Sequence, residues 1–251
     1  MVSDARELAR VRNPVLLLSA LAWILLLVEP GGMGVHAHFH AAGAGAMPLG
    51  ASFRMLLAMN PPASLAAGWF VMLVAMMSPV LIPPIRHVRQ RSFARRRARS
   101  VLLFVSAYGA VWMLAGCVVL AIELAVKRFA PQSYWPAAAV LLFVLLWQFS
   151  PVKQHCLNRC HAHTELAAFG AAADLEALRF GVTHGLWCAA SCWALMLFPM
   201  LLPRGHFVAM VAAAFLIFAE RLERPMSPAW RWRGLGSVKR ILTARLIPAD
   251  L

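Results

Sequence analysis

Long runs of apolar residues alternate with short polar connections along most of the chain. Six runs approach or exceed the length of about 20 apolar residues that a helix needs to cross a bilayer. They are Val11–Val28, Ala63–Ile85, Ser100–Val126, Tyr134–Val152, Ala177–Leu202 and His206–Leu222. Because lipid offers no hydrogen bonds to an exposed backbone, each run is expected to be helical. The pattern predicts an all-α, polytopic membrane bundle of about six transmembrane helices.

The first apolar run follows three basic residues, as the apolar part of a signal peptide does. No small-residue cleavage site follows it at the usual distance, so we interpret it as a membrane anchor. We expect residues 1–222 to form one transmembrane domain. The remaining residues, 223–251, are too few for a soluble domain and are predicted to be a basic cytoplasmic tail.

Composition agrees with membrane insertion, since 61% of the residues are hydrophobic and only 14% are charged. Soluble domains carry about 25% charged residues. The net charge of +14 would suggest a nucleic-acid partner in a soluble protein. Here, however, placing both termini in the cytoplasm puts 20 of the 24 Lys and Arg residues on that side. The positive-inside rule accounts for this distribution, so we expect the lipid bilayer as partner, no nucleic acid, and a multi-pass protein of the inner (plasma) membrane.

Four of the five cysteines form two C-x-x-x-C pairs, Cys156 with Cys160 and Cys188 with Cys192. Residues four apart share one face of a helix, so each pair offers two sulfur atoms to one ion. None of the cysteines falls in an outside loop, and a C-x-x-C motif is absent from the sequence. These two facts favour metal ligation over a disulfide framework or thiol redox transfer.

The fifth apolar run carries His184, Cys188, Cys192, Met196 and Met200 at intervals of four. Thiol and thioether sulfur select Cu(I), and imidazole suits copper or zinc. The alternative is packing, since Cys and Met are common core residues. We predict copper as the more probable ion, with zinc as the second choice.

A second cluster, residues 154–163, adds His155, His161 and His163 to the first cysteine pair. Cys156, Cys160 and one histidine are enough to begin a closed metal site. By rise per residue, Cys188 lies about 15–20 Å further along its helix from this cluster, so one joint site requires the connection to fold back. His36, His38 and His40 could also bind copper or zinc, but a solvated loop explains them at least as well. Met72 and Met76 are expected to pack in the core.

The candidate metal ligands are therefore Cys156, Cys160, Cys188, Cys192, His161, His184 and Met196. The sequence contains no phosphate-binding loop, Ser-His-Asp triad or paired catalytic carboxylates. We expect no catalytic residues, no organic cofactor and no enzymatic activity.

Three motifs resemble one bacterial family of predicted metal-binding integral membrane proteins, a domain family of unknown function. Gly185–Met196, G-L-W-C-A-A-S-C-W-A-L-M, is similar to its G-L-x-C-x-x-C-C-W-A-L-M signature. Trp69–Pro79 and Phe149–Cys160 are similar to its W-x-x-M-x-x-A-M-M-x-P and Y-x-x-T-P-L-K-x-x-C-L-x-x-C elements. The resemblance implies metal handling through the four paired cysteines. The sequence departs from the signature at Ser191, where the family commonly has another cysteine.

Two hypotheses follow from these observations. The first is a membrane protein that binds a soft metal, most simply copper, for handling or delivery, with metallochaperones or other membrane proteins as partners. The second is a metal-free membrane scaffold, or a subunit of a larger membrane complex, in which the sulfur side chains only pack.

Overall fold

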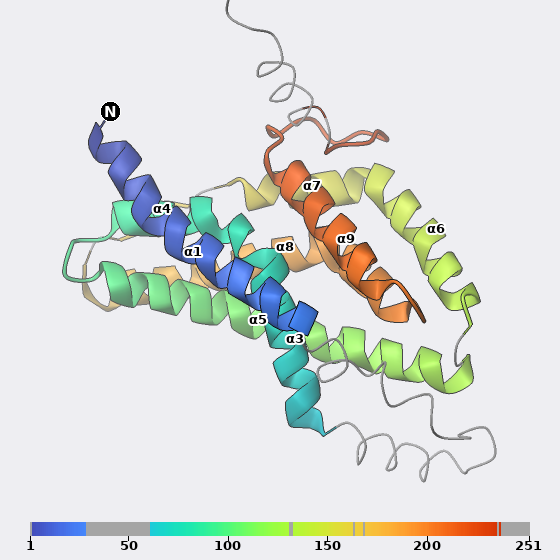
Figure 1. Ribbon diagram of the computed structural model, residues 1–251. Helices are drawn as coiled ribbons and strands as arrows, with labels where there is room; N and C mark the ends of the chain where they lie inside the picture. The colour runs from blue at the N-terminus through green and yellow to red at the C-terminus, as the bar shows by residue number, and fades with distance from the viewer. Residues whose placement is uncertain are drawn as a thin grey trace, which may run out of the picture.

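The computed structural model describes residues 2–28, 61–130, 133–162, 164–167, 169–234 and 236, and within these ranges all regular structure is helical. The helices are α1 (Val2–Val28), α3 (Pro62–Met77), α4 (Ile82–Arg91), α5 (Arg97–Phe129), α6 (Trp135–Phe149), α7 (Pro151–Cys160), α8 (Gly170–Leu201) and α9 (His206–Arg221). A short 3₁₀ turn, η2 (Pro79–Leu81), joins α3 to α4. The predicted all-α class is confirmed (Figure 1).

Three helices, α1, α5 and α8, are long and apolar enough to cross a membrane. Two bent pairs, α3 with α4 and α6 with α7, bring the number of candidate spans to five if each pair counts as one. The predicted six are not confirmed. The sixth run forms α9, whose 16 residues extend about 24 Å, which is shorter than the hydrocarbon core of about 30 Å.

Proline breaks two of the predicted spans. The run Ala63–Ile85 bends by 53° at Pro79, because proline has no N–H for the helical hydrogen bond. The run Tyr134–Val152 ends early, and the chain bends by 66° at Ser150 before α7 begins. The Ser150 hydroxyl accepts a hydrogen bond of 3.1 Å from the Val152 N–H, and Pro151 occupies the first helical position. Residues 151–160, which we expected mainly in a cytoplasmic connection, are thus a helix that leaves α6 at an angle.

Helix α8 runs through the middle of the bundle with α5 packed along it (Figure 1). Within the most apolar 18-residue stretch of α8, 61% is buried inside the bundle, against 17% for the corresponding stretch of α1 and 22% for that of α5. Ala177, Gly181 and Gly185 follow one another at intervals of four and let α5 approach closely. A Cβ atom on Gly181 would lie 2.4 Å from the Phe104 carbonyl oxygen, so this contact requires glycine.

The outer faces of the other long helices remain apolar and uncovered. Leu17 on α1, Leu114 on α5 and Leu146 on α6 are 61%, 71% and 66% exposed. Exposed leucines in this number are typical of helices that face lipid. The buried sulfur residues of α8 therefore lie in the interior of the bundle, behind a lipid-compatible surface.

Candidate metal centre

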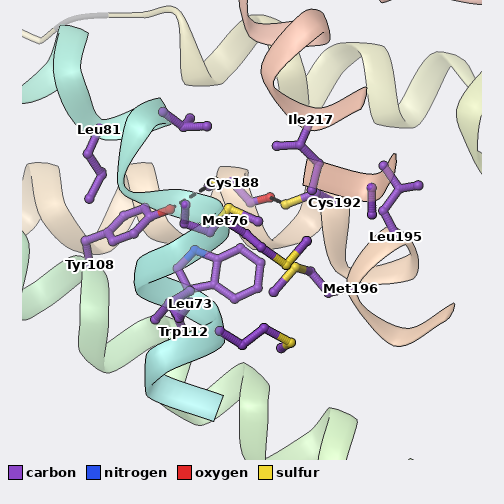
Figure 2. Close-up of a cluster of buried hydrophobic side chains, with 14 of the residues drawn as sticks. Leu73, Met76, Leu81, Tyr108, Trp112, Cys188, Cys192, Leu195, Met196 and Ile217 are labelled. Atoms are coloured by element: carbon purple, nitrogen blue, oxygen red, sulfur yellow. Dashed lines mark hydrogen bonds between the residues drawn. The ribbon is translucent and has the colours of Figure 1, made fainter. Parts of the chain in front are cut away.

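Two thiols lie in the middle of α8, in the most buried part of the protein. Cys188 and Cys192 are 0% and 1% exposed. The Cys192 thiol donates a hydrogen bond of 2.9 Å to the Cys188 carbonyl oxygen, and the hydroxyl of Tyr108 on α5 lies 3.3 Å from the Cys188 sulfur. Figure 2 shows both thiols in one cluster with Tyr108 and Trp112. The spacing of four therefore places the two sulfur atoms on one buried face, as the sequence predicts.

Cys160 of α7 lies in the same buried cluster as this pair. The guanidinium of Arg221, the last residue of α9, interacts with Cys160, Cys188 and Cys192. One of its nitrogens also lies 3.5 Å from the Ser191 hydroxyl. The bend at Ser150 packs α7 against α8, which is the folding back of the connection that a joint site requires. Arg221 thus has electrostatic interactions with three of the four predicted cysteines.

The fourth cysteine, Cys156, lies one helical turn before Cys160 and is 5% exposed. It interacts with Cys160 but lies outside the buried cluster that contains Cys188 and Cys192. The structure therefore brings Cys160 to the α8 pair and leaves Cys156 at the edge of the arrangement.

The donor set distinguishes between metals. Among the described residues, no three His, Cys, Asp or Glu side chains converge as a metal-binding group. Cu(I) prefers soft thiolate and thioether ligands, and the residues around Cys188 are of that kind. The chemistry present fits copper better than zinc.

Comparison with known proteins decides the family. The model of the family PpoB2, described as a copper chaperone, matches residues 66–242, which is about seven tenths of the chain. The chain belongs to the PpoB2 family. No curated protein and no solved structure matches it. All three motifs and all seven predicted ligands lie inside the PpoB2 match, and the copper description agrees with the metal that the sulfur residues suggest.

The two predicted histidine ligands contact neighbouring groups of this PpoB2 member. Both ring nitrogens of His161 face carbonyl oxygens, Nδ1 that of Leu157 at 2.8 Å and Nε2 that of Arg221 at 3.1 Å. His184 is 4% exposed and packs among the rings of Phe104, Tyr108 and Phe180, with centroid distances of 6.0, 5.9 and 5.7 Å. His161 thus links α7 to the end of α9, and His184 extends the aromatic wall beside Cys188. The residues His36, His38, His40 and His163 lie outside the described part of the chain.

Met196 continues the sulfur face of α8 one turn beyond Cys192 and is 1% exposed. The buried cluster that contains the thiols also contains thioethers from two other helices: Met72, Met76 and Met77 of α3 and Met210 of α9. The next predicted residue of the stripe, Met200, packs at the margin of the cluster.

A buried ion pair lies next to the thiols. The ammonium of Lys153 on α7 lies 2.5 Å from the carboxylate of Glu220 on α9, and the Gln148 amide donates a hydrogen bond of 2.6 Å to the same oxygen. Lys153 also donates to the Gln148 carbonyl oxygen. Glu220 and Lys153 are 3% and 2% exposed, and Lys153 interacts with Cys192 and Arg221.

Sequence reasoning missed Arg221, Lys153 and Glu220 as parts of the site. Lys153 and Arg221 were assigned to membrane orientation, because both stand at the ends of apolar runs. A signal was present, since Glu220 and Arg221 are adjacent and follow an apolar run without interruption. Which helix they face depends on the bend before α7, and spacing along the chain does not reveal that bend.

Proposed function

We propose that this protein binds Cu(I) inside the membrane through the thiolates of Cys188 and Cys192, with Cys160 as a third sulfur ligand, and passes it to a partner. Membership of a family described as copper chaperones supports copper handling. The single observation that carries the more specific proposal is the position of the Arg221 guanidinium, which lies 3.5 Å from the hydroxyl of Ser191, the residue before Cys192.

Charge balance gives that observation its meaning. Cu(I) bound by two thiolates is an anion of charge −1, and an uncompensated charge in a low-dielectric interior is costly. Lys153 and Glu220 neutralise each other. Arg221 then supplies the single positive charge that a copper dithiolate requires. Each thiol that is protonated before loading releases its proton as its Cu–S bond forms.

Cys160 is suited to a ligand-exchange step, in which one sulfur ligand of copper replaces another. It lies on α7, which follows the bend at Ser150. A third sulfur that approaches copper before one of the α8 thiolates leaves allows transfer without a bare ion. Copper remains Cu(I) throughout, and one Cu–S bond forms as another breaks. We propose delivery to or from a metallochaperone or membrane partner, with both ends of the chain in the cytoplasm and without a catalytic reaction.

Cu(I) titration of the detergent-purified full-length protein, with a competing chromophoric chelator, tests this function. We expect stoichiometric binding by the wild type and by Cys117→Ser, because Cys117 is an exposed cysteine of α5. The double variant Cys188→Ser/Cys192→Ser is expected to lose this tight binding. Equal trace copper in the wild type and the double variant would exclude the proposal.

The complete burial of Cys188 and Cys192 also suits the second hypothesis, a metal-free scaffold in which the thiols only pack. That hypothesis predicts that Cys188→Ala and Cys192→Ala leave the copper tolerance of cells unchanged and that partner proteins co-purify with the chain.

A further inference from the structure

Besides Met77, four buried methionines share the hydrophobic cluster of the α8 thiol pair, and the proposed function does not use them. Met72, Met76 and Met210 are 4%, 3% and 4% exposed, and Met196 is 1% exposed. All four belong to the same buried cluster as Cys188 and Cys192, although they come from α3, α8 and α9. Met72 and Met76 stand four residues apart on α3, so they share one face of that helix.

Figure 2 shows how part of this cluster is arranged. The labelled side chains of Met76, from α3, and Met196, from α8, lie in the same part of the cluster as the indole of Trp112 (Figure 2). The Trp112 side chain is 0% exposed and belongs to the same cluster. Two helices that are far apart in the sequence thus contribute thioether sulfur to the cluster that contains this aromatic ring.

The chemistry of these groups is that of a soft cation site. Thioethers are neutral, so Cu(I) bound to them keeps its positive charge and gains no charge balance from its ligands. The face of an indole ring attracts a cation, most strongly where water is excluded. Zn(II) and other harder ions gain little from thioether ligands, so such a site selects Cu(I).

We propose that Met76 and Met196, with the indole of Trp112, form a second Cu(I) site next to the cysteine pair. The proposal rests on the proposed function, because the cysteine pair supplies the neighbouring ion. The two sites differ in a measurable way: the cysteine site competes with protons, whereas the thioether site does not titrate. The thioether site is also the weaker one, since its complex is a buried cation with no carboxylate ligand.

The test uses Cu(I) titration of full-length protein in detergent with a competing chelator. The wild type is expected to bind a tight first equivalent and a weaker second one. Met76→Leu/Met196→Leu keeps the apolar volume nearly constant, and we expect it to weaken only the second equivalent by at least about tenfold. The matched control is Met77→Leu/Met113→Leu, which changes a buried and a partly buried methionine of the same cluster and is expected to bind like the wild type.

A second background isolates the thioether site. With Cys156, Cys160, Cys188 and Cys192 all changed to Ser, we expect one Cu(I) equivalent whose affinity changes less than about twofold between about pH 6 and 8, because thioethers carry no titrating proton. Zn(II) is expected not to bind this variant.

The outcomes separate the two proposals. Absence of any tight Cu(I) binding by the wild type would refute the proposed function. A tight first equivalent without a second, or a second equivalent that Met76→Leu/Met196→Leu leaves unchanged, would overturn the thioether site alone.

Discussion

Replacing Arg221 with methionine tests whether charge balance controls copper binding. The change removes one positive charge and keeps an unbranched side chain that fills much of the same space. Arg221 interacts with three thiols, so a copper dithiolate formed there loses its counter-ion in the variant. We expect Cu(I) binding to weaken strongly, while Zn(II) and unrelated ligands show no corresponding change.

The size of the effect follows from Coulomb's law. Two unit charges about 4 Å apart interact by about 4 kcal/mol at an effective dielectric constant of about 20. The guanidinium charge is shared among several partners, so about 2–4 kcal/mol is a reasonable range for the loss. This corresponds to a Cu(I) dissociation constant about 30 to 1,000 times larger. The assay is competition for Cu(I) against a chelator at fixed pH, with thermal unfolding measured in parallel.

Two further variants define what refutes the reasoning. Arg221→Lys keeps the charge but loses the planar fork, and we expect most of the affinity to remain. Arg204→Met removes an exposed arginine of the α8–α9 turn and is expected to have no effect. Wild-type affinity in Arg221→Met would disprove the charge argument. An equal loss in Arg221→Lys and Arg221→Met would show that hydrogen-bond geometry, and not charge, is responsible.

The remaining predictions concern stability. Lys153→Met leaves the Glu220 carboxylate buried without its ion-pair partner, so we expect the unfolding free energy in detergent to fall by about 3–5 kcal/mol. The double variant Lys153→Met/Glu220→Leu is expected to recover most of this loss. No recovery in the double variant would contradict this explanation. Gly181→Ala forces a Cβ atom against the Phe104 carbonyl oxygen and is expected to cost about 1–3 kcal/mol. Gly109→Ala, which meets nothing within 4 Å, is expected to be tolerated, and equal melting temperatures for these two alanine variants would argue against the close α5–α8 contact.

Part of the candidate site followed from local spacing. Cys188 and Cys192 stand four apart in a long apolar run, so a helix necessarily places them on one face. The same logic predicted that Met196 continues this face. Histidine was less predictable, because a ring nitrogen that faces a carbonyl oxygen and one that faces a metal look the same in a sequence. His161 and His184 are therefore placed by contacts with α9 and with an aromatic wall that no motif records.

The sequence alone determined the helical class and the membrane-compatible surface, because apolar run length and the need to pair every backbone group leave few alternatives. It also determined which residues pair along one helix. Only the tertiary structure decided that α7 bends away from α6 at Ser150, that Cys160 thereby joins the buried cluster of the α8 thiols, and that Arg221 lies at Ser191 beside them. The physical reason is range: helical periodicity relates residues a few positions apart, whereas a bend of 66° and the packing of α7 against α8 and α9 depend on contacts between segments about 30 to 70 residues apart.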